Sequence, residues 1–411
     1  MRFTKKNMDD TPLIDNVFTI SQLAQKAADR YGPDQVVNAT IGSLYTEAEI
    51  IAAFDSVYSV YDQISNETKA QYAQSISGNE TYIKSVYDWV RAGVSWNLHH
   101  DVIATPGGTG AIALTMMDLL DEGMSVLLPN LAWSSYRQMA KTNNLQIVTY
   151  EMFDKDHFNC QSLIDQARRI MEKQGKVMVI INDPCHNPSG YSMTVAEWKT
   201  IIDALNQLAQ KGPCILVNDI AYIDYSLDVE HSRDYFKLFN TIAPGLAVIV
   251  AHSCSKTLTS YGMRLGAAII LAQEQSVVTG IKDAFINSAR SIWSNVNNSW
   301  MDNFSQVVTA NKDAFIKEKQ QYIQLLQARS EVFIREAQSV GLAIYPYKEG
   351  FFITVKVPDI AKLTAYHQAL MDNNIFTVKL MDSIRLAICS VPVSKMTGLA
   401  IRMKKILDQL D

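Results

Sequence analysis

The run VMVIIND (177–183) is apolar at five successive positions before it reaches Asn182 and Asp183. A strand that is apolar on successive residues is typical of a sheet covered on both faces by other elements. Six further β-rich runs lie on either side of it along the chain: VIAT (102–105), SVLLP (125–129), QIVTYEM (146–152), CILVND (214–219), AVIVAHS (247–253) and GAAIILA (266–272). We therefore expect a sheet of seven strands between residues 102 and 272.

Helical patterns separate several of these strands, notably at residues 109–120 and 194–210. Thr194 followed by Glu197 is a capping-box pattern, which predicts the start of a helix. Strands that alternate with helices predict an α/β fold with a mostly parallel sheet. Because such sheets bind ligands at the carboxyl ends of their strands, we expect the functional residues there.

The pattern changes after Gln273, where long helical stretches replace the alternation. The elements expected there are helices at 277–289, 311–340, 361–373 and from Ser394 onward, and strands at 351–357, 375–380 and 383–389. This order predicts a smaller α+β domain joined to the sheet by a long connecting helix.

The first 45 residues contain one predicted helix (21–31) and the extended run VVNATIG (36–42), too little for an independent domain. We expect them to pack on the small domain or on a partner subunit. The expected organisation is an N-terminal arm with part of the small domain at 1–45, a large domain at 46–300 and a small C-terminal domain at 301–411.

The composition is that of a folded protein: 48% of the 411 residues are hydrophobic and 19% are charged, with a formal net charge of −5. The basic residues form no block or stripe, so we expect no nucleic-acid partner.

The five cysteines form no CxxC pair, so we expect no disulfide framework and no thiolate metal site. The stretch MRFTKKNMDDTPLID lacks the apolar core of a secretory signal, and no apolar run approaches the ~20 residues of a membrane span. We expect a cytoplasmic protein with no membrane partner.

Two turns rich in glycine or proline follow predicted strands. TPGGTGA (105–111) opens a predicted helix, where backbone N–H groups suit a phosphate, and a simple tight turn is an equal alternative. It lacks the GxGxxG spacing of a dinucleotide fold and the lysine of a P-loop. In DPCHNPSG (183–190) a turn is the default interpretation, and the side chains of His186 and Asn187 at a strand end are the functional alternative. Cys185 and His186 are adjacent without a second pair, so we expect no metal site.

Two further motifs place charged side chains after buried strands. In NDIAY (218–222), Asp219 is placed to cap a helix, hold a metal or pair with a cation, and Tyr222 brings a phenol near the same ligand. In SCSKTLTSYGMRLG (253–266), Lys256 is either a side chain that reaches solvent or a desolvated amine suited to forming a Schiff base. Arg264 in the same motif offers a guanidinium for a phosphate.

The order of these motifs along the chain is specific: GGTGA, W-x-x-Y, N-P-S-G, D-x-A-Y, S-x-S-K and an arginine eight residues after the lysine. In this order the sequence resembles the class I/II aminotransferases of aspartate and aromatic type, which are pyridoxal 5′-phosphate (PLP) enzymes of fold type I. The resemblance covers residues 38–390. It implies a mixed, mainly parallel seven-stranded sheet with helices on both faces, and a smaller α+β domain.

The resemblance assigns most of the motif residues to the cofactor. Lys256 would carry PLP as a Schiff base, Asp219 would pair with the ring nitrogen, and Tyr222 would complete the set of catalytic residues. Asn187 and Tyr222 would hydrogen-bond the phenolic oxygen of the ring, and Trp133 in PNLAWSSY would stack on its face. The residues that would hold the phosphate are Gly108, Thr109, Ser253, Ser255 and Arg264.

Four further residues match contacts to the substrate or to a neighbouring subunit. Arg385 in SIRLAIC would bind the substrate α-carboxylate in a bidentate pair, with the backbone of Gly42 in TIGSLY near that carboxylate. Tyr72 would reach the PLP phosphate of a neighbouring subunit, and Arg290 in ARSIWSN would face a distal substrate carboxylate across the dimer. The resemblance therefore implies a homodimer with shared active sites.

Three positions depart from the family pattern. Gly107 stands where the family often has a small hydroxyl residue, and Met263 precedes Arg264 where an acidic residue is common. After Arg290 the chain continues with WSNVNN (293–298) where the aspartate enzymes usually have prolines. This last difference weakens the assignment of an acidic substrate.

We therefore expect a PLP-dependent aminotransferase that moves an amino group between an L-amino acid of aspartate, glutamate or aromatic type and a 2-oxo acid, by a ping-pong mechanism. The alternatives are a PLP-dependent β-lyase or decarboxylase on the same fold, and a non-catalytic PLP-binding regulator. Such a regulator carries a DNA-binding module before its PLP domain, for which the short, non-basic N-terminal segment leaves no room. A dehydrogenase interpretation of GGTGA leaves Lys256 and Arg264 unexplained.

Overall fold

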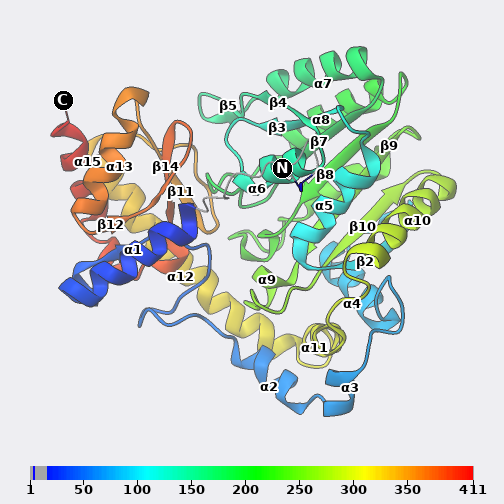
Figure 1. Ribbon diagram of the computed structural model, residues 1–411, viewed down its shortest axis with the longest axis horizontal. Coiled ribbons are helices and arrows are strands. Elements are labelled where there is room, and N and C mark those ends of the chain that lie inside the picture. Colours follow the sequence, from blue (N-terminus) through cyan, green and yellow to red (C-terminus); the bar gives the residue numbers. More distant parts are fainter. Residues whose placement is uncertain (1–2, 5–15, 411) are drawn as a thin grey trace.

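The computed structural model describes residues 3–4 and 16–410. One sheet holds seven strands in the order β2 (His99–Thr105), β10 (Gly266–Ala272), β9 (Leu246–Ser253), β8 (Cys214–Asp219), β7 (Val177–Asn182), β3 (Ser125–Pro129) and β4 (Gln146–Tyr150) (Figure 1). Every pairing from β9 to β4 is parallel, and β10 is antiparallel to both of its neighbours. The prediction of a mixed, mainly parallel sheet of seven strands is confirmed.

The central strands are buried because the sheet is covered on both faces. All residues of β3, β7, β8, β9 and β10 are buried, as their apolar runs predict. Alternate side chains of β7 point to opposite faces: Val177, Val179 and Ile181 belong to one hydrophobic cluster, and Met178 and Ile180 belong to another. The sheet is therefore held between two separate cores.

Helices cover each of these cores. The helices on the side of Met178 are α5 (Gly107–Leu119), α6 (Ser134–Thr142) and α10 (Gln275–Ile292). Those on the side of Val179 are α4 (Glu80–Arg91), α7 (Cys160–Gln174), α8 (Val195–Leu208) and α11 (Asn298–Val308). The predicted capping box is present at α8, where Thr194 Oγ1 accepts from the backbone N–H of Glu197 and the Glu197 carboxylate accepts from the N–H of Thr194. Shorter elements of this part are α2 (Asp55–Gln63), α3 (Asn66–Ala70), α9 (Cys254–Thr257), the hairpin strands β5 (Phe153–Asp154) and β6 (His157–Phe158), and the 3₁₀ helices η2 (Ile223–Tyr225) and η3 (Asp234–Thr241).

A second, smaller layer is built from both ends of the chain (Figure 1). Its antiparallel sheet has the order β11 (Phe352–Lys356), β14 (Ser383–Ala387) and β13 (Val378–Lys379). Beside it, β1 (Val37–Asn38) pairs in parallel with β12 (Ile375–Phe376). Its helices are α1 (Asn16–Tyr31), α13 (Leu363–Asp372), α14 (Val393–Met396) and α15 (Leu399–Asp408), with the 3₁₀ helices η1 (Pro33–Gln35), η4 (Ile360–Lys362) and η5 (Ile388–Ser390).

The long helix α12 (Lys312–Val340) connects the two parts of the molecule. In Figure 1 it runs from α11 and α2 to the smaller layer, and it packs against α2 and α11 in one part and against α15 in the other. The domain boundaries at residues 45 and 300 stay predictions, and part of the predicted N-terminal arm lies outside the described residues.

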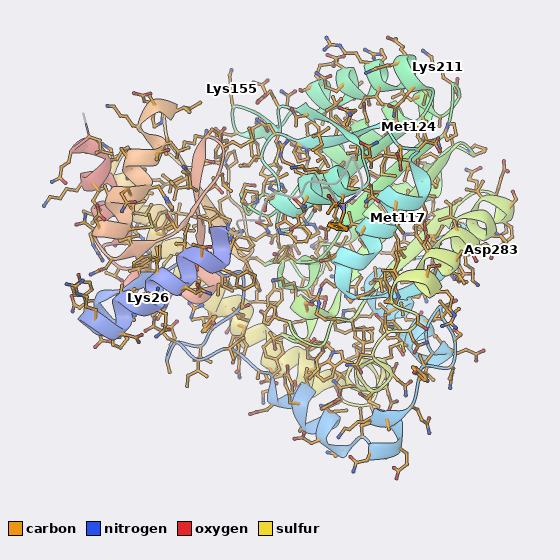
Figure 2. All side chains as sticks on the ribbon, viewed as in Figure 1. Lys26, Met117, Met124, Lys155, Lys211 and Asp283 are labelled. Atoms are coloured by element: carbon orange, nitrogen blue, oxygen red, sulfur yellow. The ribbon has the colours of Figure 1, made fainter. Side chains whose placement is uncertain are left out.

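Two predicted elements are divided in the structure. The terminal helix predicted from Ser394 consists of α14 and α15, because Gly398 between them adopts a positive φ of 79° that a helix does not include. The run 375–380 forms β12 and β13, which belong to different sheets. Among the residues that the structure describes, no helix is long and apolar enough to cross a membrane. Figure 2 shows charged side chains such as Lys155 and Lys211 at the periphery, where they are exposed.

Candidate active site

A cavity of about 450 Å³ opens at the edge of the large sheet where the parallel strands end. Asp219 is the last residue of β8, Ser253 is the last residue of β9, and Asn187 follows β7. Because the carboxyl ends of parallel strands meet at one edge, these side chains converge. Twelve of the fourteen predicted site residues line the cavity: Gly42, Gly108, Thr109, Trp133, Asn187, Asp219, Tyr222, Ser253, Ser255, Lys256, Arg264 and Arg385.

The amine of Lys256 lies in this cavity, on the short helix α9 that follows β9. Its Nζ donates to the carbonyl of Gly42 at 2.5 Å and lies 4.7 Å from the centroid of the Tyr261 ring. Burial lowers the pKa of Lys256 to about 8, and the guanidinium groups of Arg385 and Arg264 act in the same direction. A large fraction of such amines is neutral at mildly alkaline pH, which a nucleophile or a proton acceptor requires.

The Asp219 carboxylate is a buried group of the cavity lining. Its Oδ2 accepts from Tyr136 Oη at 2.5 Å, and its Oδ1 accepts from the backbone N–H of Ala221 at 3.0 Å. Burial raises the pKa of Asp219 to about 6, although both donors and Lys256 act in the opposite direction. Among the described residues, no group of three or more His, Cys, Asp or Glu is arranged to hold a metal ion. A buried carboxylate held by two donors offers its negative charge to a cation in the cavity.

Asn187 lies between a phenol and a guanidinium. Its Nδ2 donates to Tyr222 Oη at 3.4 Å, and its Oδ1 accepts from Arg385 Nη1 at 3.4 Å. Arg385 comes from β14 of the smaller layer; its Nη2 donates to Thr40 O at 2.7 Å, and its Cζ lies 4.6 Å from the centroid of the Phe352 ring. Groups from three parts of the chain therefore orient this guanidinium at the cavity wall.

The first turn of α5 and Arg264 form a cradle for an anion. Arg264 Nη1 donates to Ser255 Oγ at 2.9 Å, and its Nη2 donates to Pro106 O at 3.4 Å. A Cβ on Gly107 would lie 2.7 Å from Arg264 Nη2, and Gly107 has a positive φ of 73°. The departure from the family pattern at Gly107 thus has a steric reason. Backbone N–H groups at a helix start, next to a guanidinium, suit a phosphate.

Tyr72 and Arg290 lie outside this cavity. Tyr72 is 87% exposed, and Arg290, in the last turn of α10, is exposed and donates to Ser294 Oγ. Their segments are adjacent, because the backbone N–H of Ala73 donates to Asn295 Oδ1 at 2.6 Å. A single chain does not bring these two side chains to its own cavity, so their predicted roles require a second subunit.

Ten further residues line the cavity that were not among the predicted site residues: Val17, Phe18, Ile41, Ser43, Ser135, Tyr136, Asn182, Ala221, Tyr261 and Phe352. Tyr136 has a local signal, because it follows Trp133 at helical spacing in the W-x-x-Y motif. Phe352 has none, because it reaches Arg385 only through the pairing of β11 with β14.

A family model described as aminotransferase class I and II matches residues 36–402. The chain is 27% identical over 198 residues to the aromatic-amino-acid aminotransferase of Pseudomonas aeruginosa and 26% identical over 247 residues to the aspartate aminotransferase of Escherichia coli. These matches cover 47% and 58% of this chain and 47% and 59% of the relatives, so the chain matches about half the length of its curated relatives. An aminotransferase structure from Anaerococcus prevotii has a TM-score of 0.95 at 30% identity, over 98% of this chain and 99% of that one.

Proposed function

Because the chain belongs to the class I and II aminotransferase family, we propose that it is a PLP-dependent aminotransferase that moves an amino group between an L-amino acid and a 2-oxo acid. One observation carries the proposal. The Lys256 amine, the Asp219 carboxylate and the Arg385 guanidinium line one cavity beside an anion cradle. Transamination requires one such group for the proton, one for the cofactor ring and one for the substrate carboxylate.

The residues of the cavity fit PLP by size and by chemistry. The Arg264 guanidinium lies close to the start of α5 at Gly107, so a cation and the first backbone N–H groups of a helix face the same anion position. Buried Asp219 suits a cationic ring nitrogen, and the desolvated amine of Lys256 suits a carbonyl carbon. When bound, PLP would withdraw electrons from the Cα of the substrate into its ring. The phosphate contacts would come from Gly108, Thr109, Ser253, Ser255 and Arg264, and the ring contacts from Trp133, Asn187, Asp219 and Tyr222.

Arg385 would bind the amino acid, and Lys256 would transfer its proton. The Arg385 guanidinium, held against Phe352, offers two parallel N–H groups to the α-carboxylate. Lys256 Nζ would then take the proton from Cα as a general base and return it to C4′ of the cofactor as a general acid. A pKa of about 8 suits both steps, because the amine and its conjugate acid coexist near neutral pH.

Asp219 would keep the proton on the ring nitrogen. Hydrogen bonds from Tyr136 and Ala221 to its two oxygens favour the ionised carboxylate and orient it. Its burial excludes water, which strengthens its attraction to a cation. We infer that Tyr136, although it is not one of the motif residues assigned to PLP, supports this contact.

We further propose a homodimer with shared active sites. Tyr72 and Arg290 are exposed on neighbouring segments, where a second copy of the chain would meet them. Arg290 of that copy would then face the distal carboxylate of aspartate or glutamate. The apolar side chains of Val17, Phe18 and Ile41 on the cavity wall would accommodate an aromatic amino acid instead.

A panel of amino donors with 2-oxoglutarate, followed by the absorbance of bound PLP, tests the proposal. A true donor removes the yellow band of the PLP-bound protein, and Lys256→Ala lacks that band from the start. Pyruvate and ammonia released from a β-substituted amino acid, without transamination, would favour a lyase. A wild-type protein that never takes up PLP would contradict the proposal as a whole.

A further inference from the structure

A cluster of charged side chains is buried behind the cavity, on the side away from the ligand space. Its centre is Asp224 in η2, whose Oδ1 lies 2.8 Å from Arg233 Nη2 and 3.5 Å from Lys319 Nζ. Its Oδ2 accepts from Trp89 Nε1 at 3.1 Å and from Thr257 Oγ1 at 2.7 Å. The Asp224, Arg233 and Lys319 side chains are 3%, 9% and 7% exposed. We call Asp224, these four partners and His252 the Asp224 network.

Burying the charged side chains of the Asp224 network costs desolvation free energy. Burial alone would raise the pKa of Asp224, but Lys319 and Arg233 outweigh burial and hold the pKa well below its usual range. The carboxylate is therefore ionised at neutral pH. Buried ion pairs are often no more stabilising than apolar side chains of the same volume. Stability by itself is a weak reason for the network, which points to a role in the neighbouring cavity.

Members of the network are close in sequence to residues of the cavity. Thr257 follows Lys256 directly, and Asp224 lies two residues after Tyr222. Within η2, Tyr225 Oη donates to the backbone carbonyl of Lys256 at 2.9 Å. The turn that carries Lys256 is therefore held twice from η2, at the carbonyl of Lys256 and at the side chain of the next residue.

The Thr257 hydroxyl accepts one hydrogen bond and donates another. Thr257 Oγ1 donates its single proton to Asp224 and lies 3.0 Å from His252 Nε2. Burial lowers the pKa of His252 to about 4, so the ring is neutral at pH 7 and carries one N–H. Because the Thr257 proton goes to Asp224, the contact with His252 is satisfied by an N–H on Nε2, and Nδ1 is buried without a hydrogen-bond partner within the described part of the chain. Because His252 donates to the Thr257 hydroxyl and Asp224 accepts from it, the Thr257 side chain is confined to one rotamer.

We propose that Asp224 is a positioning residue for Lys256, which it holds through the hydroxyl of Thr257 so that the amine stays in the desolvated cavity beside Tyr222. The inference rests on the proposed role of Lys256 in carrying PLP. Asp224 itself touches neither substrate nor cofactor. Lys319 lies on α12, so the network also links that helix to η2.

Thr257→Val tests the proposal, because it removes the hydroxyl, keeps the shape and leaves the pairs of Asp224 with Arg233 and Lys319 in place. Thr257→Ser is the matched variant that retains the hydroxyl. Lys319→Met is a second control, which weakens the network at α12 without touching the contact between Asp224 and Thr257. The charged and titratable groups that face Lys256 are the same in every variant: Asp219, Cys389, Arg264, Arg385, Tyr222 and Tyr261.

The first measurement needs no cofactor. The rate at which formaldehyde and cyanoborohydride methylate Lys256 in the PLP-free protein is followed by peptide mass spectrometry as a function of pH. In Thr257→Val the looser turn admits water to the amine, so the midpoint of this profile rises by roughly 1 pH unit. PLP affinity falls about fivefold to tenfold, in the range expected for the loss of one ordinary hydrogen bond. Thr257→Ser restores both values.

A purely structural role predicts a different result. In that case Thr257→Val and Lys319→Met both lower the denaturation midpoint, while the methylation profile and the PLP affinity keep their wild-type values, and the proposal is overturned. Failure of the proposed function gives a different result, because the wild-type protein then takes up no PLP at all. The methylation profile still reports the environment of Lys256 in that event.

Discussion

The Asp219 carboxylate shows how burial and hydrogen bonding oppose each other at one residue. Tyr136 and the backbone of Ala221 donate to it, yet burial prevails and raises its pKa to about 6. In the protein without cofactor, the ionised carboxylate therefore lowers stability at neutral pH. A cationic ring nitrogen placed against it would remove that cost, which links the affinity for PLP to the ionisation of Asp219.

We expect Asp219→Asn to raise the free energy of unfolding of the cofactor-free protein at pH 7 by up to about 3 kcal/mol. A carboxyl group with a raised pKa binds its proton more tightly in the folded state than in the unfolded chain. Its contribution to stability is therefore complete below about pH 4 and is lost as the pH rises through about 6. Urea unfolding of both proteins from pH 5 to pH 8 measures the difference, which shrinks as the pH falls. A difference that does not vary with pH would show that ionisation of Asp219 is not its cause.

Gly107→Ala tests the steric argument for the anion cradle. The new Cβ would displace the Arg264 guanidinium, so we expect PLP affinity to fall at least tenfold, by roughly the free energy of one charge-assisted contact. Gly123→Ala is the matched control, because Gly123 also has a positive φ, of 84°, and no atom lies within 4 Å of its added Cβ. Both variants lose about 1 kcal/mol of stability from backbone strain. Equal PLP affinities, measured by fluorescence titration, would contradict the cradle.

At the scale of elements, α12 holds a wall of the cavity through one buried cation. Arg329 Nη2 donates to Tyr45 O at 2.9 Å, its Nη1 donates to Cys389 O at 2.8 Å, and its Nε donates to Glu47 Oε1 at 3.1 Å. Tyr45 and Glu47 belong to the segment that begins with Gly42 at the cavity wall. The position of the wall therefore depends on a helix that runs between both layers of the molecule.

We expect Arg329→Met to lower the free energy of unfolding by about 3 kcal/mol, because it removes the buried guanidinium that donates to the carbonyls of Tyr45 and Cys389 and to the Glu47 carboxylate. It should also raise the KM for the amino acid, since the displaced segment directly follows Thr40, whose carbonyl orients Arg385. Arg335→Met, at an exposed position of the same helix, should change stability by less than about 0.5 kcal/mol. Urea unfolding and steady-state kinetics check both effects. An unchanged KM in a destabilised Arg329→Met protein would limit Arg329 to a structural role.

At the scale of the whole molecule, the cavity is assembled from distant parts of one chain and, in our proposal, from a second chain. Gly42 comes from the N-terminal segment, Lys256 from the large sheet layer and Arg385 from the smaller layer. Tyr72 and Arg290 lie outside the cavity of their own chain. Activity should therefore depend on subunit association as well as on the fold of each subunit.

Mixing two defective variants tests this dependence. Lys256→Ala lacks the amine in its own site, and Arg290→Ala lacks the guanidinium that it would lend to its partner. Random reassociation of equal amounts gives hybrids in half of the dimers, each with one complete site, so about a quarter of the wild-type activity towards aspartate should appear. Steady-state rates before and after unfolding and refolding the mixture together measure the gain. Activity equal to the mean of the separate variants would contradict shared sites.

Local sequence was sufficient for the large sheet. The runs 125–129, 214–219 and 266–272 begin and end at the same residues as β3, β8 and β10. Burial on both faces imposes an unbroken apolar run, which is visible without knowledge of the partners of the strand. The same logic located the cavity, because motifs that directly follow parallel strands must gather at one edge of the sheet.

The sequence by itself therefore determined the strands of the sheet, the edge at which its ligand binds and the order of the motif residues along the chain. Only the tertiary structure decided which distant partners such residues meet: Tyr136 for Asp219, Phe352 for Arg385, and Lys319 for Asp224. The pairing of β1 with β12 from opposite ends of the chain belongs to the same class. The physical reason is the separation in sequence of the residues in contact. A strand or a capped helix depends on burial and hydrogen bonds among neighbouring residues, which leave a periodic pattern in the sequence. The contacts named here join residues distant in sequence and leave no such pattern.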